Sequence, residues 1–250
     1  MRSCIASIAV LVVTCLTHSA GAQGLGTLKG QFVFNSKPPK PAMGVAGPGG
    51  IIPDESLLVD AESLGIANII VSLYGKPGEK LPEPILEGGD AIDLDVHQAR
   101  FEPRIAIVNL KQALVISNAD KVGHVTTADL LANEPFAFAL KPGERVPVRF
   151  LLREPLPTRL KDAIHPWLTG YLVVTESFAT VSNNQGKFEI PDLPPGKWTF
   201  RVWHERSGFI EDVRRDGKLE AWKKGRVTLE IRPNDNDLGE IRISPKEFPD

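Results

Sequence analysis

Three side chains that could bind a metal ion lie in two short stretches of the sequence. His124 follows Val122 and Gly123, and Asp162 comes 38 residues later, three positions before His165. Two imidazoles and one carboxylate can hold Cu(II) or Zn(II) when water fills an open coordination position. The alternative is a surface loop whose histidines serve packing, with Asp162 solvated as most aspartates are.

The N-terminal residues predict export. Arg2 precedes an apolar run from Cys4 to Leu16, and Ala20-Gly21-Ala22 places small residues where a signal peptidase cuts. We therefore expect residues 1–22 to be removed as a signal peptide, and the mature protein to be periplasmic or extracellular. The apolar run is shorter than the ~20 residues that span a bilayer. No later segment is apolar enough to do so, and we expect no membrane span after cleavage.

The expected mature chain has no cysteine, because Cys4 and Cys15 both lie in the leader. This excludes disulfides, cysteine-based zinc sites, c-type haem attachment and a blue-copper thiolate. Without Arg2 the chain carries 28 basic and 31 acidic side chains, a formal charge of −3. No basic face is therefore indicated for nucleic acid or anionic lipid, and neither is an expected partner.

Short β-rich runs separated by Gly, Pro and Asn turns predict an all-β protein. No helical period of useful length occurs outside the leader. Residues 41–53, rich in glycine and proline, are expected to form a loop. The expected strands are residues 26–34, 67–74, 92–97, 101–103, 104–109, 113–118, 136–140, 145–152, 170–175, 187–190, 197–204, 227–231 and 238–243.

The segment from Asp162 to Leu168 resembles the ligand loop of cupredoxins, in which Cys-x-x-His is followed shortly by Met. His165 matches the second histidine ligand, whereas Asp162 replaces the cysteine and Leu168 replaces the methionine. The turn at 118–120 before His124 resembles the way cupredoxins present their first histidine. This resemblance implies that His124, Asp162 and His165 share one site.

The cupredoxin resemblance implies a Greek-key barrel over residues 90–176. Because thiolate and thioether sulfur tune a blue-copper couple, we expect no redox function from a site that lacks both. No cofactor is required by the sequence, although copper or zinc is possible in a type-2 or zinc site.

Residues 186–200 follow the pattern Gly-x-Phe-x-Ile-x-x-Leu-Pro-Pro-Gly-x-x-x-Phe. This run resembles the carboxypeptidase-regulatory-like, transthyretin-related β-sandwich, but the opening strands of that family do not precede it locally. Residues 30–38 and 67–74 look like the missing strands. We therefore expect a discontinuous sandwich of residues 26–75 plus 177–245. The residues leave open an alternative, in which 26–176 are all cupredoxin-like and only 177–245 form the sandwich.

No catalytic motif is present, because the sequence lacks Gly-x-Ser-x-Gly, His-Glu-x-x-His and a phosphate-binding glycine loop. We therefore expect a non-enzymatic binding or scaffold protein that meets a protein or glycan partner outside the cytoplasm. In cupredoxins the second-histidine loop meets partner proteins, so Pro166, Trp167 and Leu168 are the expected docking residues. The alternatives are a type-2 Cu(II) or Zn(II) protein and a carbohydrate-binding module that uses an exposed tryptophan.

Overall fold

The computed structural model describes residues 24–40, 44–47, 50–76, 78–86 and 91–249. Within them the chain is almost entirely β, as the sequence predicts, and only two short 3-10 turns are helical, η1 (Lys223–Gly225) and η2 (Pro245–Glu247). The expected signal peptide, residues 1–22, lies outside the described residues. No helix among the described residues is long and apolar enough to cross a membrane.

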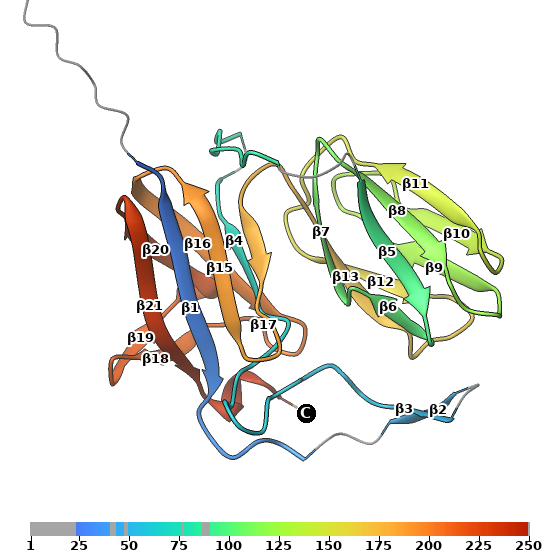
Figure 1. Cartoon of the computed structure of the whole chain (residues 1–250), viewed down its shortest axis with the longest axis horizontal. Coiled ribbons are helices and arrows are strands. Elements are labelled where there is room, and N and C mark those ends of the chain that lie inside the picture. Colours follow the sequence, from blue (N-terminus) through green and yellow to red (C-terminus); the bar gives the residue numbers. More distant parts are fainter. Residues whose placement is uncertain (1–23, 41–43, 48–49, 77, 87–90, 250) are drawn as a thin grey trace, which may run out of the picture.

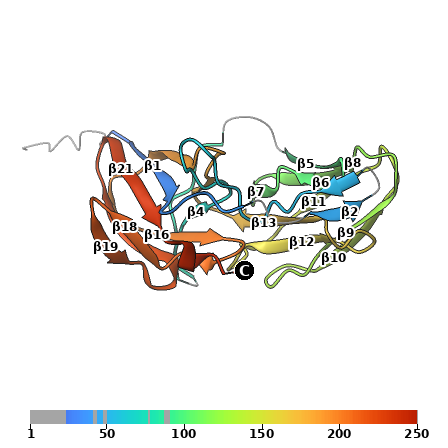
Figure 2. The ribbon, with the colours of Figure 1, turned by 90° about the horizontal axis from the view of Figure 1, so that it is seen from below.

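The strands form two units that lie side by side (Figures 1 and 2). The middle unit contains β5 (Ala91–His97), β6 (Arg100–Glu102), β7 (Ile105–Asn109), β8 (Ala113–Asn118), β9 (His124–Ala128), β10 (Phe136–Leu140), β11 (Arg145–Arg149), β12 (Thr158–Asp162) and β13 (Thr169–Thr175). The terminal unit contains β1 (Gly26–Phe34), β4 (Ile70–Leu73), β14 (Ala179–Val181), β15 (Lys187–Leu193), β16 (Gly196–His204), β17 (Gly208–Phe209), β18 (Asp212–Arg215), β19 (Lys218–Ala221), β20 (Arg226–Ile231) and β21 (Asn234–Ile243).

The middle unit is an open pair of sheets, so the expected Greek-key barrel takes the form of a β-sandwich without closure. One sheet has the order β10-β9-β12-β13-β7 and the other β11-β8-β5-β6, with no ladder joining their edges among the described residues. Their inner faces bury an apolar core that includes Leu94, Leu114, Leu160 and Leu172. The strand β12 was not expected, because its sequence TRLKD alternates charged and inward residues and ends on a polar side chain.

The terminal unit is built from both ends of the described chain. β1 pairs antiparallel with β15 and parallel with β21, and β4 lies between β14 and β16. This is the pairing that the discontinuous arrangement requires, since no strand of residues 26–73 pairs with the middle unit in the part of the chain that the structure describes. The domain boundaries themselves stay a prediction.

Residues 45–47 and 50–52 form a small hairpin, β2 (Val45–Gly47) with β3 (Gly50–Ile52). The expectation that residues 41–53 are only a loop is therefore wrong for this part of the stretch. Glycine and proline predict turns well but do not exclude a short hairpin.

A seam joins the two units. Ile70 of β4 packs against Ile105 and Val173 of the middle unit, and Tyr171 meets Trp203 edge to face with ring centroids 4.9 Å apart. A bidentate ion pair from Arg104 to Glu205, at 2.6 and 2.7 Å, crosses the same seam. Apolar contact and a fork-to-fork ion pair thus fix the units against each other.

A substitution at Gly186 tests whether β1 packs in the core of the terminal unit. It has φ +75°, and an added Cβ would lie 2.2 Å from the carbonyl oxygen of Phe32 on β1. Gly186→Ala should therefore lower the free energy of unfolding by about 3 kcal/mol, the sum of a left-handed backbone cost and an overpacking cost. Urea unfolding followed by fluorescence measures this loss.

Gly217→Ala is the matched control, because Gly217 also has φ +75° but has open space where its Cβ would lie. It should lose only the backbone cost of about 1 to 2 kcal/mol. Equal losses for the two variants would show that β1 does not pack against Gly186.

Candidate metal centre

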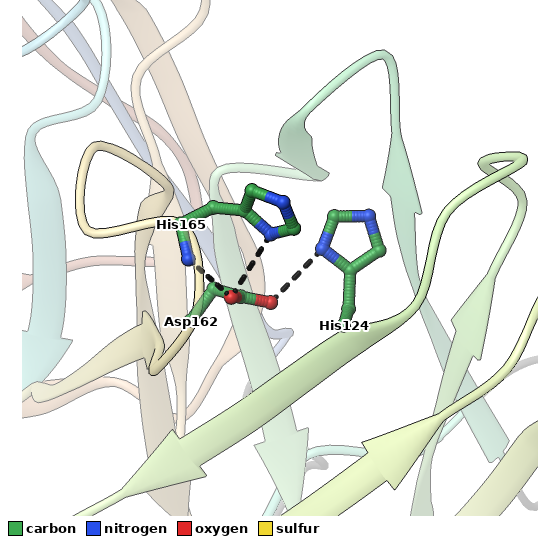
Figure 3. A group of neighbouring side chains, drawn as sticks. All are labelled: His124, Asp162 and His165. Atoms are coloured by element: carbon green, nitrogen blue, oxygen red, sulfur yellow. Dashed lines mark hydrogen bonds and ion pairs between the residues drawn. The ribbon is translucent and has the colours of Figure 1, made fainter. Parts of the chain in front are cut away.

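The middle unit brings His124, Asp162 and His165 together (Figure 3). His124 is the first residue of β9 and Asp162 is the last residue of β12, its antiparallel neighbour. β12 alternates buried and exposed residues, so Asp162 points inward like Leu160. The turn after Asp162 then reverses the chain, so His165 lies next to the end of β12. All three predicted metal residues therefore meet at one end of the sandwich.

The carboxylate of Asp162 is the centre of the cluster, with its side chain fully buried. Oδ2 accepts a hydrogen bond from the Val125 N–H at 3.0 Å and lies 2.9 Å from His124 Nδ1. Oδ1 accepts from the N–H groups of Ile164 at 2.8 Å and His165 at 2.7 Å, and lies 3.1 Å from His165 Nδ1. Three backbone donors therefore fix the carboxylate, while both imidazoles face it.

A second carboxylate holds His124 from the other side. Asp120 Oδ2 lies 3.2 Å from His124 Nε2. Asp120 is itself fixed by the N–H groups of Gln98 at 2.6 Å and Ala99 at 2.9 Å, the two left-handed residues of the β5–β6 turn. An Nε2–H donated to Asp120 leaves Nδ1 directed at the cluster, which is the orientation that outer carboxylates impose on metal-binding histidines.

The donor set and its spacing fit a divalent cation. One ligand atom from each of the three residues lies within 4.8 Å of the others. Ligand atoms about 2.1 Å from a shared zinc or copper ion are roughly 3.0 to 3.4 Å apart at bond angles between square and tetrahedral. Asp162 Oδ2 lies 2.9 Å from His124 Nδ1 and Oδ1 lies 3.1 Å from His165 Nδ1, so both contacts are already close to this range. The cluster as a whole spans up to 4.8 Å, so the imidazoles would have to move inward to share one ion. With no sulfur donor the cluster does not fit a blue-copper centre.

The cluster lies just beneath the surface. The side chain of His165 is 13% exposed, whereas those of His124 and Asp162 are fully buried. The rings of His124 and His165 are 4.7 Å apart, and His165 meets Trp167 edge to face at 5.3 Å. An ion held by the two histidines would therefore be reached from solvent past His165.

The expected docking residues occupy three different environments. Pro166 is exposed, Trp167 is half-buried against the core of the middle unit, and Leu168 is 1% exposed. Leu168 cannot contact a partner and is removed from the docking surface, because it fills the core below the histidine loop. Sequence reasoning missed Val122 and Ile164, which are 43% and 56% exposed and flank the two histidines.

None of the four tryptophans, all of which the structure describes, forms an exposed platform for sugar rings. Trp222 is buried, and Trp167, Trp198 and Trp203 are half-buried. The carbohydrate-binding alternative therefore loses the feature that suggested it, since stacking on a sugar needs an open aromatic face.

His204 lies outside the cluster, in the terminal unit, and is fully buried against Phe248. Desolvation lowers the pKa of His204 to about 3, and the charges of Arg104 and Arg206 act in the same direction. The folded protein therefore keeps this ring neutral, whereas the unfolded chain takes up a proton below pH ~6.5.

Stability should consequently fall as the pH drops from 6.5 towards 3, because only the unfolded state gains the His204 proton in that window. Between pH 7 and pH 5 the His204 contribution to the unfolding free energy falls by about 2 kcal/mol. His204→Gln should remove this part of the pH dependence in urea unfolding. Parallel pH profiles for the variant and the wild type would contradict the assignment.

No family model matches the sequence, and no curated protein matches it. A copper-containing nitrite reductase (NirK) from Thermus scotoductus SA-01 is similar in structure, at 21% identity and TM-score 0.32, over 42% of this chain and 25% of its own. This chain thus corresponds to about a quarter of that reductase. A purple cupredoxin from Nitrosopumilus maritimus is similar at 16% identity and TM-score 0.29, over 33% of this chain and 98% of its own.

A mutant of amicyanin in its oxidised state is similar at 18% identity and TM-score 0.31, over 34% of this chain and 82% of its own. These similarities are partial and low in TM-score. The chemistry of the site is therefore judged from the contacts of this chain alone.

Proposed function

We propose that the mature chain is an exported, non-enzymatic binding protein that holds a divalent cation, Cu(II) or Zn(II), through His124, Asp162 and His165. The observation that carries this proposal is the convergence of three ligand atoms within 4.8 Å around a carboxylate that backbone N–H groups hold in place. A preorganised carboxylate loses little conformational freedom on binding an ion.

The ligand set favours a binding role over electron transfer. A bound ion would supply one open coordination position, which water fills and a donor from a ligand can take. Copper held by two imidazoles and a carboxylate would give a type-2 rather than a blue centre, since no thiolate is present. The three backbone donors to Asp162 would stay in place, and only the two imidazole contacts would change partner.

Calorimetric titration of the metal-free mature chain with Cu(II) and with Zn(II) tests this proposal. We expect one-to-one, sub-micromolar binding and no strong blue absorption band in the copper sample. His165→Ala should weaken binding at least 100-fold, because it removes one of three ligands.

His97→Ala is the matched control, since His97 is half-buried at the end of β5 and belongs to no metal cluster among the described residues. The affinity of this variant for Cu(II) and Zn(II) should equal that of the wild type. Unchanged affinity in His165→Ala, or absence of binding in the wild type, would overturn the metal proposal.

A scaffold role is the second candidate, supported by the apolar rim around the cluster. We define this rim as Val122, Ile164 and Pro166, all exposed residues on the two loops that carry the histidines. Exposed apolar side chains gathered at one end of a domain favour contact with a partner protein over solvent.

Photo-crosslinking in the native host tests the rim. A crosslinking residue in place of Ile164 should give one discrete adduct, and Ile164→Ser should weaken binding of the purified adduct partner about 10-fold. Leu131 is the control position, because it is 72% exposed and follows the opposite end of β9. Equal crosslinking from positions 131 and 164 would argue against a docking surface at the rim.

A further inference from the structure

Two arginines of the terminal unit lie next to each other without a carboxylate partner among the described residues. Arg201 on β16 and Arg226 on β20 are directly opposite in the antiparallel ladder. Their Cζ atoms lie 4.4 and 4.7 Å from the centroid of the Tyr74 ring. Neither guanidinium forms an ion pair in the part of the chain that the structure describes, in contrast to Arg104, which binds two glutamates across the seam.

The Arg201–Arg226 pair destabilises the folded protein when no anion is bound. Like charges directly opposite in a ladder repel each other, and both arginines are half-buried. The Nε atom of each guanidinium is buried with no hydrogen-bond partner among the described residues. Desolvation and the neighbouring charge of Arg226 both lower the pKa of Arg201. Such groups are normally paired when they are buried, so the pair lacks a counter-charge.

Each of the two guanidinium groups uses one Nη atom in a hydrogen bond within the protein. Arg201 Nη1 donates to the Pro155 carbonyl at 2.7 Å, and Arg226 Nη1 lies 3.4 Å from the Tyr74 hydroxyl. Stacking on Tyr74 fixes the plane of each guanidinium, and the centroid of the Phe209 ring lies 5.3 Å from Arg201 Cζ. A planar guanidinium held in this way can present a donor fork to a carboxylate.

Arg201 lines a cavity of about 420 Å³ between the two units. Its walls are largely apolar and include Ile70, Leu156, Val173 and Trp203. The other charged groups in the lining are already paired. Arg153 binds Glu176 at 3.1 Å, and the carboxylate of Glu154 accepts the N–H groups of residues 131–133. Arg201 is therefore the charged residue of the lining that lacks such a partner among the described residues, and it lies beside an apolar surface. The cavity thus favours an anion with an apolar part.

We propose that this cavity binds an amphiphilic carboxylate, an apolar body whose carboxylate is bound by Arg201. Arg226 does not line the cavity but adds positive charge from the neighbouring strand. The apolar body would lie against Leu156, Val173 and Trp203, which favours such a ligand over a small inorganic anion. The carboxylate would be bound by the Nη groups of Arg201, since the Nε atoms of both arginines are buried, and its charge would offset the repulsion between the two arginines. The site is remote from the metal centre and does not depend on the metal proposal.

Binding of octanoate to the metal-free mature chain tests this inference through tryptophan fluorescence and calorimetry. We expect saturable one-to-one binding. Octanol, which lacks the charge, should bind at least 10-fold more weakly, and inorganic phosphate, which lacks the apolar body, should not compete at equal concentration.

Arg201→Gln should weaken octanoate binding at least 10-fold, and Arg201→Lys should give an intermediate loss, because it keeps the charge but not the fork. Arg226→Gln should give a smaller loss than Arg201→Gln, because Arg226 acts only through its charge. Arg232→Gln is the matched control, since Arg232 is exposed just after β20, and His165→Ala controls for the metal centre. Both controls should bind octanoate as the wild type does, and thermal unfolding without ligand confirms that each variant is folded.

Four outcomes would overturn the inference. Octanol binding as tightly as octanoate would show an apolar cavity without a role for charge. Full octanoate affinity in Arg201→Gln would place the ligand elsewhere. Competition by inorganic phosphate at equal concentration would show that charge alone binds, without a role for the apolar walls. No saturable binding to the folded wild type would exclude a carboxylate of this class.

Discussion

The carboxylate of Asp162 is the interaction on which the site depends. A buried carboxylate is unfavourable unless hydrogen bonds replace the water that it loses. Asp162 meets this condition with three backbone N–H groups, drawn from β9 and from its own turn, and both imidazoles lie in contact with it. The same contacts that make the charge tolerable hold both histidines in place, so the local stability and the ligand geometry have one cause.

The two sides of the seam differ in whether their arginines have acidic partners. On one side of the seam Arg104 meets Glu205 and Glu55, and the charges are balanced. On the other side Arg201 and Arg226 share Tyr74 and have no acidic partner among the described residues. Balanced pairs fix the relative position of the units, whereas unbalanced charge beside a cavity favours a ligand. Metal binding and anion binding would thus use separate parts of the protein.

Much of the fold could be predicted from turn chemistry and alternation. The strand at 113–118 and the strand at 136–140 appear at the predicted bounds, because clear turns and β-branched or aromatic residues mark them. β12 could not be predicted in this way, since its inward residues are Thr158, Leu160 and Asp162 rather than an apolar set. The pairing of 45–47 with 50–52 could not be predicted, because the glycines in this stretch usually indicate loops.

The sequence indicated which residues form the candidate metal site, but it did not indicate all of their contacts. The spacing in 162–168 selected Asp162 and His165, and only the cupredoxin resemblance joined them to His124. The role of Asp120 as the outer partner of His124 depends on the β5–β6 turn, which no local pattern connects to residue 120. Arg201 and Arg226 stand 25 residues apart and meet only through the ladder register, so no sequence motif indicated the pair.

The most direct test of the account is anomalous diffraction from crystals of the mature protein soaked in Zn(II). The account predicts one strong peak within bonding distance of His124 Nδ1, His165 Nδ1 and an Asp162 oxygen, with the backbone hydrogen bonds to Asp162 intact. A structure in which zinc binds elsewhere, or in which both imidazoles keep their hydrogen bonds to Asp162 and no ion is bound, would contradict it.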